Sequence, residues 1–149
     1  MTLPKEFLGK WIEAASKHST ALVENWEKLG TYTSIILNND DCILTEVANS
    51  MSLRSYPRNY YSVDGILYTD HDLVPKRKEN EYWFRSISVA FEHEHNFNHN
   101  LYQEIAHLLI LRSELSVIVT YPEGDESPLM TYFHDIIKNC SHSKELSEK

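Results

Sequence analysis

Residues 82–94, YWFRSISVAFEHE, decide the fold, because their β-branched and aromatic composition predicts one long β-strand. Side chains alternate between the two faces of a strand, so Glu92 and Glu94 share one face with Ala90, while Phe91 lies on the other. The strand therefore ends with two carboxylates that project together beside small residues. Carboxylates in a buried strand need a metal ion or a polar partner.

A second strand is predicted at residues 60–68, YYSVDGILY, and a polar segment connects it to the first. We expect the two strands to pair as an antiparallel hairpin with a loose connection. Asp64 would then lie beside the strand that carries Glu92 and Glu94, so that three carboxylates converge on a small volume. Because like charges repel at such distances, a divalent cation is the usual remedy.

Helices are predicted in the N-terminal third of the chain. Apolar residues recur at helical spacing over residues 4–29, and Gly30 marks the expected end of this helix. Residues 31–38 fit either a strand or the start of another helix. A run of Asn and Asp then provides a cap for a helix over residues 41–53.

The C-terminal half predicts a helix over residues 99–112, a strand over residues 115–121, LSVIVTY, and a closing helix over residues 129–137. A continuous β-branched run of this kind is typical of a strand buried on both faces. The order strand, helix, strand implies a right-handed parallel crossover. The predicted fold class is therefore α/β (α+β), with a central mixed β-sheet flanked by helices and an extra N-terminal helix.

A chain of 149 residues fits a single domain. We divide it into an N-terminal helix at residues 1–30, a core at residues 41–121 and a flexible polar tail at residues 140–149. Trp11 and Trp26 place an aromatic stripe on the N-terminal helix, so a homodimer through that helix is expected.

The formal net charge of −8 argues against a general nucleic-acid binder, because such proteins gain much of their affinity by releasing counterions with Lys and Arg. Local patches matter more than the total, and nucleic acid remains a candidate partner. The basic patches are formed by Lys76, Arg77 and Lys78 and by Arg54 and Arg58.

No stretch approaches the roughly eighteen apolar residues that a membrane span requires. The N-terminus lacks the apolar segment of a signal peptide, so we expect a cytoplasmic protein with no membrane partner. Cys42 and Cys140 belong to no CxxC motif, and both are expected to be free thiols.

The predicted order of elements places Glu46 on a helix, Asp64 on the next strand, and Glu92 and Glu94 on the strand after that. Over roughly residues 41–121 this order resembles the core of the PD-(D/E)xK nuclease superfamily, which has the restriction endonuclease-like fold. In that family an acid on the second strand and an acid-x-lysine motif on the third bind Mg²⁺. A glutamate on the preceding helix often completes the site.

The resemblance implies a metal-dependent nuclease that hydrolyses phosphodiester bonds with Mg²⁺ or Mn²⁺ as its cofactor. Asp64, Glu92 and the backbone carbonyl of His93 would hold the ion, and Glu46 would bind a second ion or orient water. Glu94 stands where the family has lysine, as in some type II restriction enzymes, and would act as a general base. The expected catalytic residues are therefore Glu46, Asp64, Glu92 and Glu94.

Further candidates for substrate contact lie outside this set. Gln103 and Glu104 stand where some members of the superfamily place a glutamine, and Gln103 is the residue we expect to contact substrate. The basic residues Lys76, Arg77 and Lys78 are candidates for binding nucleic acid.

Each candidate also has a structural interpretation. Asp64 precedes Gly65, which is typical of a turn or a bulge. The other polar candidates would be exposed surface residues: Glu46, Glu92, Glu94, Gln103 and Glu104. A transition-metal site is a separate hypothesis for His93, His95 and His99. Either base stacking or core packing accounts for Tyr56, Tyr60 and Tyr61.

A different class of function also fits the sequence. A non-catalytic member of the same fold would serve as a binding or assembly module, which the acidic charge and the missing lysine favour. An acidic protein that mimics nucleic acid is a third hypothesis. Geometry separates these hypotheses, because catalysis requires Asp64 and Glu92 to place carboxylate oxygens within reach of one ion.

Overall fold

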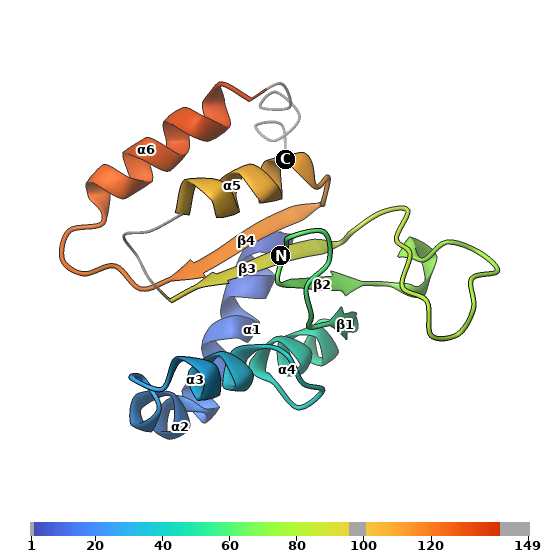
Figure 1. The fold of residues 1–149 in the computed structure, drawn as a ribbon, viewed down its shortest axis with the longest axis horizontal. Helices are drawn as coiled ribbons and strands as arrows, with labels where there is room; N and C mark the ends of the chain where they lie inside the picture. The colour runs from blue at the N-terminus through green and yellow to red at the C-terminus, as the bar shows by residue number, and fades with distance from the viewer. Residues whose placement is uncertain (1, 96–100, 141–149) are drawn as a thin grey trace.

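The computed structural model describes residues 2–95 and 101–140. A four-stranded mixed β-sheet lies between two layers of helices (Figure 1), which confirms the predicted fold class. The strands are β1 (Arg54–Tyr56), β2 (Gly65–Tyr68), β3 (Val89–Glu94) and β4 (Leu115–Thr120). The helices are α1 (Leu3–Lys17), α2 (Ser19–Glu24), α3 (Leu29–Ile36), α4 (Ile43–Ser50), α5 (Leu101–Ile110) and α6 (Ser127–Lys138), and a 3₁₀ turn, η1 (Asp70–Asp72), follows β2.

The strands lie in chain order across the sheet. β2 pairs antiparallel with both β1 and β3, and Gly65 lies opposite Phe91. β3 and β4 are parallel and are connected through α5, with Val89 opposite Leu115. The predicted antiparallel hairpin and the predicted parallel crossover are both confirmed.

Alternation along β3 divides the core between the two faces of the sheet. Val89 and Phe91 lie in the core cluster shared with α1 and α4, where Trp11 packs on Phe91 with ring centroids 5.3 Å apart. Ala90 lies in a cluster with Leu108 of α5, and α6 packs outside α5. Side chains at alternate positions of β3 therefore lie either against α1 and α4 or under α5.

The single N-terminal helix predicted over residues 4–29 is wrong, because the chain forms α1, α2 and α3 instead. The first break falls at His18, where Lys17 and His18 both bind the Glu46 carboxylate of α4. The residues after this break include Thr, Val and Asn, which have weak helix propensity. Gly30 lies inside α3, so the ambiguous segment that follows it is mainly helical.

The aromatic stripe expected on one helix is also absent from the described residues. Trp11 packs in the core on Phe91, whereas Trp26 follows α2 and packs edge-on against Tyr32, with ring centroids 5.3 Å apart. A homodimer through the N-terminal helix, which rested on this stripe, stays a prediction.

β2 is shorter than predicted because its first residues form a tight turn. Tyr60 and Val63 exchange two backbone hydrogen bonds of 2.8 and 3.1 Å. Tyr61 and Ser62, between them, both have positive φ, as in a type I′ turn. Asp64 follows this turn and precedes the first strand residue, Gly65, so it lies beside the sheet rather than in the middle of a strand.

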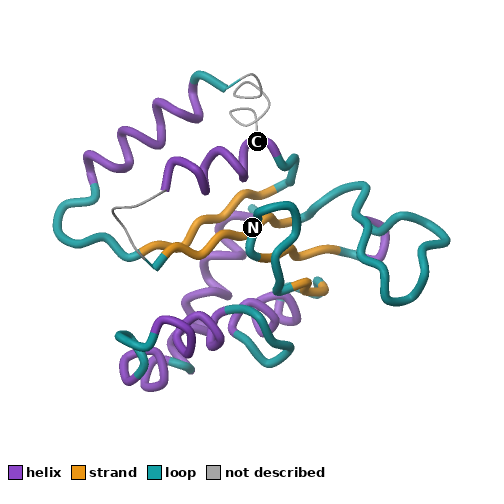
Figure 2. The backbone as a smooth tube through the Cα atoms, viewed as in Figure 1, coloured by secondary structure: helices purple, strands orange, loops and turns teal. Residues whose placement is uncertain are grey.

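β3 also begins later than predicted, because residues 82–88 belong to a long irregular connection (Figure 2). The buried Asp72 carboxylate organises this connection by accepting hydrogen bonds from the Ser86 and Ser88 hydroxyls and from the Thr69 backbone N–H. These bonds hold the segment against η1, where it cannot continue the ladder with β2.

The prediction that LSVIVTY is buried on both faces is wrong. β4 is the last strand in the order of the sheet, and five of its six side chains are half-buried, with Ser116 exposed. Its apolar residues nevertheless pack on both faces of the sheet. Val117 packs against the core cluster that contains α1, and Ile118 packs against the clusters that contain α5 and α6.

Several simpler expectations agree with the structure. Helices occur near residues 41–53 and 129–137, as α4 and α6, and both cysteines are free thiols. No helix in the described residues has the length and apolar character needed to cross a bilayer. Of the predicted tail, residues 140–149, the structure describes Cys140, and the rest lies outside the described residues.

Candidate metal centre

Glu92 is the central residue of the candidate site. Its position in β3 places it on the α5 side of the sheet, and only 1% of the residue is exposed. One carboxylate oxygen, Oε1, has no hydrogen-bond partner within residues 2–95 and 101–140. That atom lies 3.7 Å from Nδ1 of His107. A buried carboxylate oxygen without a hydrogen-bonding neighbour is costly, so its retention requires an explanation.

α5 supplies two further polar side chains to the same place. Glu104 and His107 are three residues apart, so both lie on one face of the helix. Oε2 of Glu104 lies 3.6 Å from Nδ1 of His107, which also has no hydrogen-bond partner in the described residues. One ligand atom from each of Glu92, Glu104 and His107 lies within 4.8 Å of the other two. We call these three residues the Glu–Glu–His group.

Asp64 reaches the site from the start of β2. Because Gly65 pairs with Phe91 in antiparallel register, the preceding Asp64 lies next to Glu92 and His93. Its Oδ2 accepts a hydrogen bond of 2.9 Å from the backbone N–H of His93. This bond fixes the Asp64 carboxylate beside β3, so the predicted meeting of Asp64 and Glu92 is present in the structure.

The electrostatics of the site agree with this geometry. Burial raises the pKa of Glu92 well above its usual value of 4.5, and the negative charges of Asp64 and Glu104 raise it further. Without a cation, the site therefore favours a proton on Glu92. A divalent ion would reverse this preference, since it stabilises the ionised carboxylate.

The donor set fits a divalent metal ion. Carboxylate oxygens and an imidazole nitrogen bind such ions, and two of these donor atoms lack other hydrogen-bond partners in the described residues. Ligand atoms that share one ion at about 2.0–2.2 Å lie about 3–4 Å apart. The separations of 3.6 and 3.7 Å are therefore already close to those that a shared ion requires.

Glu94 lies on the same face of β3 as Glu92, two residues further along the strand, and is half-buried. It pairs across the sheet with Thr120 of β4, whose buried hydroxyl has no hydrogen-bond partner in the described residues. The strand thus places Glu94 next to the Glu–Glu–His group, at the end of β3. The two carboxylates share one side of the strand, as the alternation of the sequence predicts.

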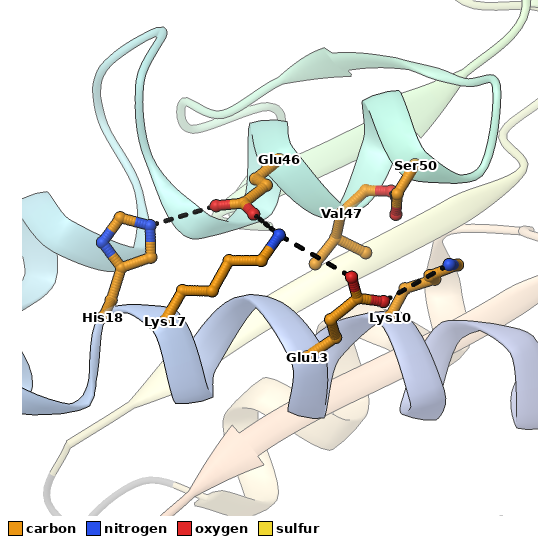
Figure 3. Close-up of polar contacts among 7 residues, drawn as sticks. All are labelled: Lys10, Glu13, Lys17, His18, Glu46, Val47 and Ser50. Atoms are coloured by element: carbon orange, nitrogen blue, oxygen red, sulfur yellow. Dashed lines mark hydrogen bonds and ion pairs between the residues drawn. The ribbon is translucent and has the colours of Figure 1, made fainter.

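Glu46 lies elsewhere. It is on α4, which packs on the α1 side of the sheet, and its carboxylate accepts hydrogen bonds from Lys17 at 2.6 Å and His18 at 3.0 Å (Figure 3). These hydrogen bonds, with that of Lys17 the larger influence, lower the pKa of Glu46. Glu46 therefore joins α4 to the end of α1, and the structure does not bring it to Asp64 and Glu92.

The expected substrate-binding residues are also outside the Glu–Glu–His group. Gln103 is exposed on α5, one residue before Glu104. Lys76 and Lys78 lie in the connection that follows the C-terminal end of β2, whereas Asp64 precedes its N-terminal end. Arg77, between them, donates hydrogen bonds to three backbone carbonyls of that connection, those of Lys78, Glu79 and Glu81.

His107 is not among the site residues predicted from the sequence, and Glu104 is named there only beside Gln103, where some members of the superfamily place a glutamine. A signal was present, since Glu104 and His107 form a Glu-x-x-His pair on the helix that follows the acidic strand. That spacing places a carboxylate and an imidazole on one helix face, as in metal-binding helical bundles. The signal becomes specific only when the face of α5 that meets the sheet is known.

His93 of β3 and His95, which follows the strand, belong to an aromatic cluster on the opposite face of the sheet. Nε2 of His93 lies 3.1 Å from the Tyr121 hydroxyl, and burial, together with His95, lowers the pKa of His93 to about 4. His95 packs on Trp26 with ring centroids 4.4 Å apart. His99, the third residue of the transition-metal hypothesis, lies outside the described residues.

Comparisons with known proteins identify no relative. No protein-family model matches the chain, and neither the curated proteins nor the solved structures gave a match.

Proposed function

We propose that the chain is a metal-dependent nuclease that hydrolyses phosphodiester bonds of nucleic acid. The observation that carries the proposal is the buried Glu92, whose unpartnered oxygen lies among Asp64, Glu104 and His107. Such a site is costly in the absence of a cation and suited to holding one. The cofactor proposed is Mg²⁺ or Mn²⁺.

The order of elements supports the resemblance to the PD-(D/E)xK superfamily. α4 is followed by three consecutive strands of one sheet, then by α5 and the parallel strand β4. Asp64 immediately precedes the second of these strands, and Glu92 and Glu94 lie on the third. The positions of Asp64 and Glu92 support the likeness to the two acids of the motif, whereas Glu94 stands at the position of its lysine.

The proposed roles follow from the positions of the side chains. Asp64 and Glu92, with the backbone carbonyl of His93, would hold the ion, and the His93 N–H fixes the orientation of the Asp64 carboxylate. When bound, the ion would neutralise charge that builds on the phosphate and would make water more acidic. Glu94, on the same face of β3, would accept a proton from the attacking water.

A surface hollow of about 280 Å³, lined by residues that flank the turn before Asp64 and the C-terminal end of α5, offers a place for the nucleic acid. Tyr61 is two-thirds exposed at its rim, held by the strained turn before Asp64, and would stack on a base. Arg85 and Arg112 also line the hollow and would attract phosphate. Leu111, another lining residue, donates its backbone N–H to the carbonyl of His107, so this end of the hollow lies one helical turn from His107.

A non-catalytic binding or assembly module is the second candidate function. Glu94 occupies the position where the superfamily has lysine, and several basic side chains are already paired. Arg54 binds Asp70 at 3.0 Å, and Arg58 lies 3.7 Å from Asp40. Such pairing reduces the positive charge available to a nucleic-acid backbone.

Cleavage assays separate the two candidate functions. Purified protein is incubated with single- and double-stranded DNA and RNA in Mg²⁺ or Mn²⁺, alongside Asp64→Asn and Glu92→Gln. The nuclease proposal expects cleavage by the wild type and a loss of at least about 100-fold in both variants. The matched control is Glu123→Gln, an exposed acid in the loop before α6, which should cleave like the wild type. Failure of the wild type to cleave any substrate with either metal would favour the binding module.

A further inference from the structure

We infer that the Glu–Glu–His group, Glu92, Glu104 and His107, is a transition-metal site that takes an ion such as Zn²⁺ in preference to Mg²⁺. The inference rests on the proposed function only for the location of the site. It deepens that function by naming the class of ion and by adding two ligands from α5 that the family resemblance does not supply.

The first argument is the number and direction of the donors. Oε1 of Glu92 and Oε2 of Glu104 lie 3.7 and 3.6 Å from Nδ1 of His107, and one ligand atom of each residue lies within 4.8 Å of the other two. These separations are longer than hydrogen bonds, so the three side chains are close without satisfying one another. Movements of a fraction of an ångström would bring all three donors to a common ion at about 2.0–2.2 Å.

The second argument is the burial of Glu92. It is 1% exposed and its Oε1 has no hydrogen-bond partner among the described residues, although a surface acid would bond to water. Acidic clusters on protein surfaces are common without an ion, but this carboxylate is enclosed between β3 and α5. A cation is the partner that offsets both its burial and its repulsion from Asp64 and Glu104.

The imidazole decides which class of ion fits. Mg²⁺ prefers oxygen ligands and retains several waters, whereas imidazole nitrogen suits Zn²⁺ and its neighbours in the first transition series. His107 is held by α5 with Nδ1 directed toward both glutamates, and Nδ1 has no other hydrogen-bond partner in the described residues. A set of two carboxylates and one imidazole therefore favours a transition metal.

The strongest rival site lies on the other face of the sheet. His95 has a buried Nδ1 without a hydrogen-bond partner in the described residues, and His93 lies beside it with ring centroids 6.4 Å apart. Trp26, Tyr32 and Tyr121 enclose these rings, and no carboxylate of the described residues forms a candidate metal group with them. An experiment must therefore distinguish the ligand His107 from His95.

Calorimetric titration of the full chain with Zn²⁺ and with Mg²⁺ tests the inference. The wild type should bind one Zn²⁺ at this site at least about tenfold more tightly than Mg²⁺. His107→Gln and Glu104→Gln should each weaken Zn²⁺ binding by about 10–100-fold, since loss of a direct ligand costs at least as much as loss of a supporting contact. His134→Gln removes an exposed histidine of α6 and serves as the control that should bind like the wild type.

Absorption of bound Co²⁺ provides a second readout, because its visible spectrum depends on the ligands and should change in His107→Gln but not in His95→Gln. Circular dichroism of each metal-free variant verifies that it is folded. If His107→Gln does not fold, Glu104→Gln tests the site in its place. Unchanged Zn²⁺ binding in His107→Gln, or a loss confined to His95→Gln, would overturn the inference. Cleavage supported only by Mg²⁺ without tight Zn²⁺ binding would refute this inference alone, whereas Zn²⁺ binding without cleavage would refute the nuclease proposal alone.

Discussion

At the scale of single residues, two buried carboxylates have opposite environments. Asp72 accepts four hydrogen bonds, two from Thr69 and one each from Ser86 and Ser88, and these bonds organise the connection before β3. Glu92 is more deeply buried, and one of its oxygens lacks any such donor in the described residues. The first carboxylate stabilises the fold, whereas the second is kept at the expense of stability, as functional residues often are.

The first prediction concerns Glu92→Gln in metal-free protein. Glutamine has nearly the same shape but no charge, so the variant avoids burying an ionisable group among acids. We expect the free energy of unfolding at pH 7 to rise by roughly 1–3 kcal/mol, because folding of the wild type must either protonate Glu92 or bury its charge and glutamine requires neither. Urea denaturation in the presence of a chelator measures it. A clear loss of stability relative to both the wild type and Glu123→Gln would mean that Glu92 has a structural role.

The second prediction concerns Asp72→Asn and its dependence on pH. Burial raises the pKa of Asp72, but hydrogen bonds from Ser86, Thr69 and Ser88 outweigh it, so the pKa lies below its usual 3.8. A depressed carboxyl pKa means that the stabilisation is present above pH 3.8 and is lost as the pH falls through the lower folded-state value. We expect Asp72→Asn to lose about 1–3 kcal/mol at pH 7 and less in acid.

Urea denaturation at pH 7 and at the lowest pH where the wild type is folded would measure this difference. Asp70→Asn is the control, because Asp70 is an exposed neighbour whose ion pair with Arg54 lies at the surface. A gap between wild type and Asp72→Asn that is equal at both pH values would show that the carboxylate charge is not what stabilises the loop.

At the scale of elements, β2 depends on a close approach to α4. Gly65 begins this strand, and a Cβ at that position would lie 2.6 Å from Cδ2 of Leu44, which is fully buried on α4. The glycine next to Asp64 is therefore explained by packing, and its φ is not among the positive values of the chain. The same packing holds Asp64 beside β3.

We therefore predict that Gly65→Ala destabilises the protein by about 1–3 kcal/mol, as overpacking of a core does. Gly9→Ala is a matched control that should change the free energy of unfolding in the opposite direction. Gly9 lies in α1, and a methyl group there would meet nothing within 4 Å. That variant should gain roughly 0.5–1 kcal/mol from helix propensity. Thermal or urea unfolding compares the two, and a neutral Gly65→Ala would show that Leu44 can move away without cost.

The elements also show what a sequence can and cannot predict. The pairing of the two acidic strands and the crossover to residues 115–121 followed from residue type and order, because both depend on local patterns. The break at His18 did not, since apolar spacing continues past it and His18 binds Glu46, which is far away in the sequence. The late start of β3 likewise depends on Asp72, whose bonds to Ser86 and Ser88 are tertiary.

At the scale of the whole molecule, the two faces of the sheet have different contents. Phe7, Trp11 and Phe91 fill the side covered by α1 and α4, whereas the α5 side combines apolar clusters with Glu92, Glu104 and His107. Alternation along β3 predicted that Glu92 and Glu94 share a face. Which helix covers that face is set by the crossover, so His107 could be identified only from the fold.

Location of a bound ion by X-ray diffraction tests the central claim most directly. Crystals of the full chain are soaked in Mn²⁺, and the anomalous signal of the ion identifies its position without reference to activity. We predict an anomalous peak between β3 and α5 within about 2.0–2.3 Å of a carboxylate oxygen of Glu92. A crystal that binds no Mn²⁺ at millimolar concentration, or binds it only at His93 and His95, would contradict the claim that Glu92 belongs to a metal centre.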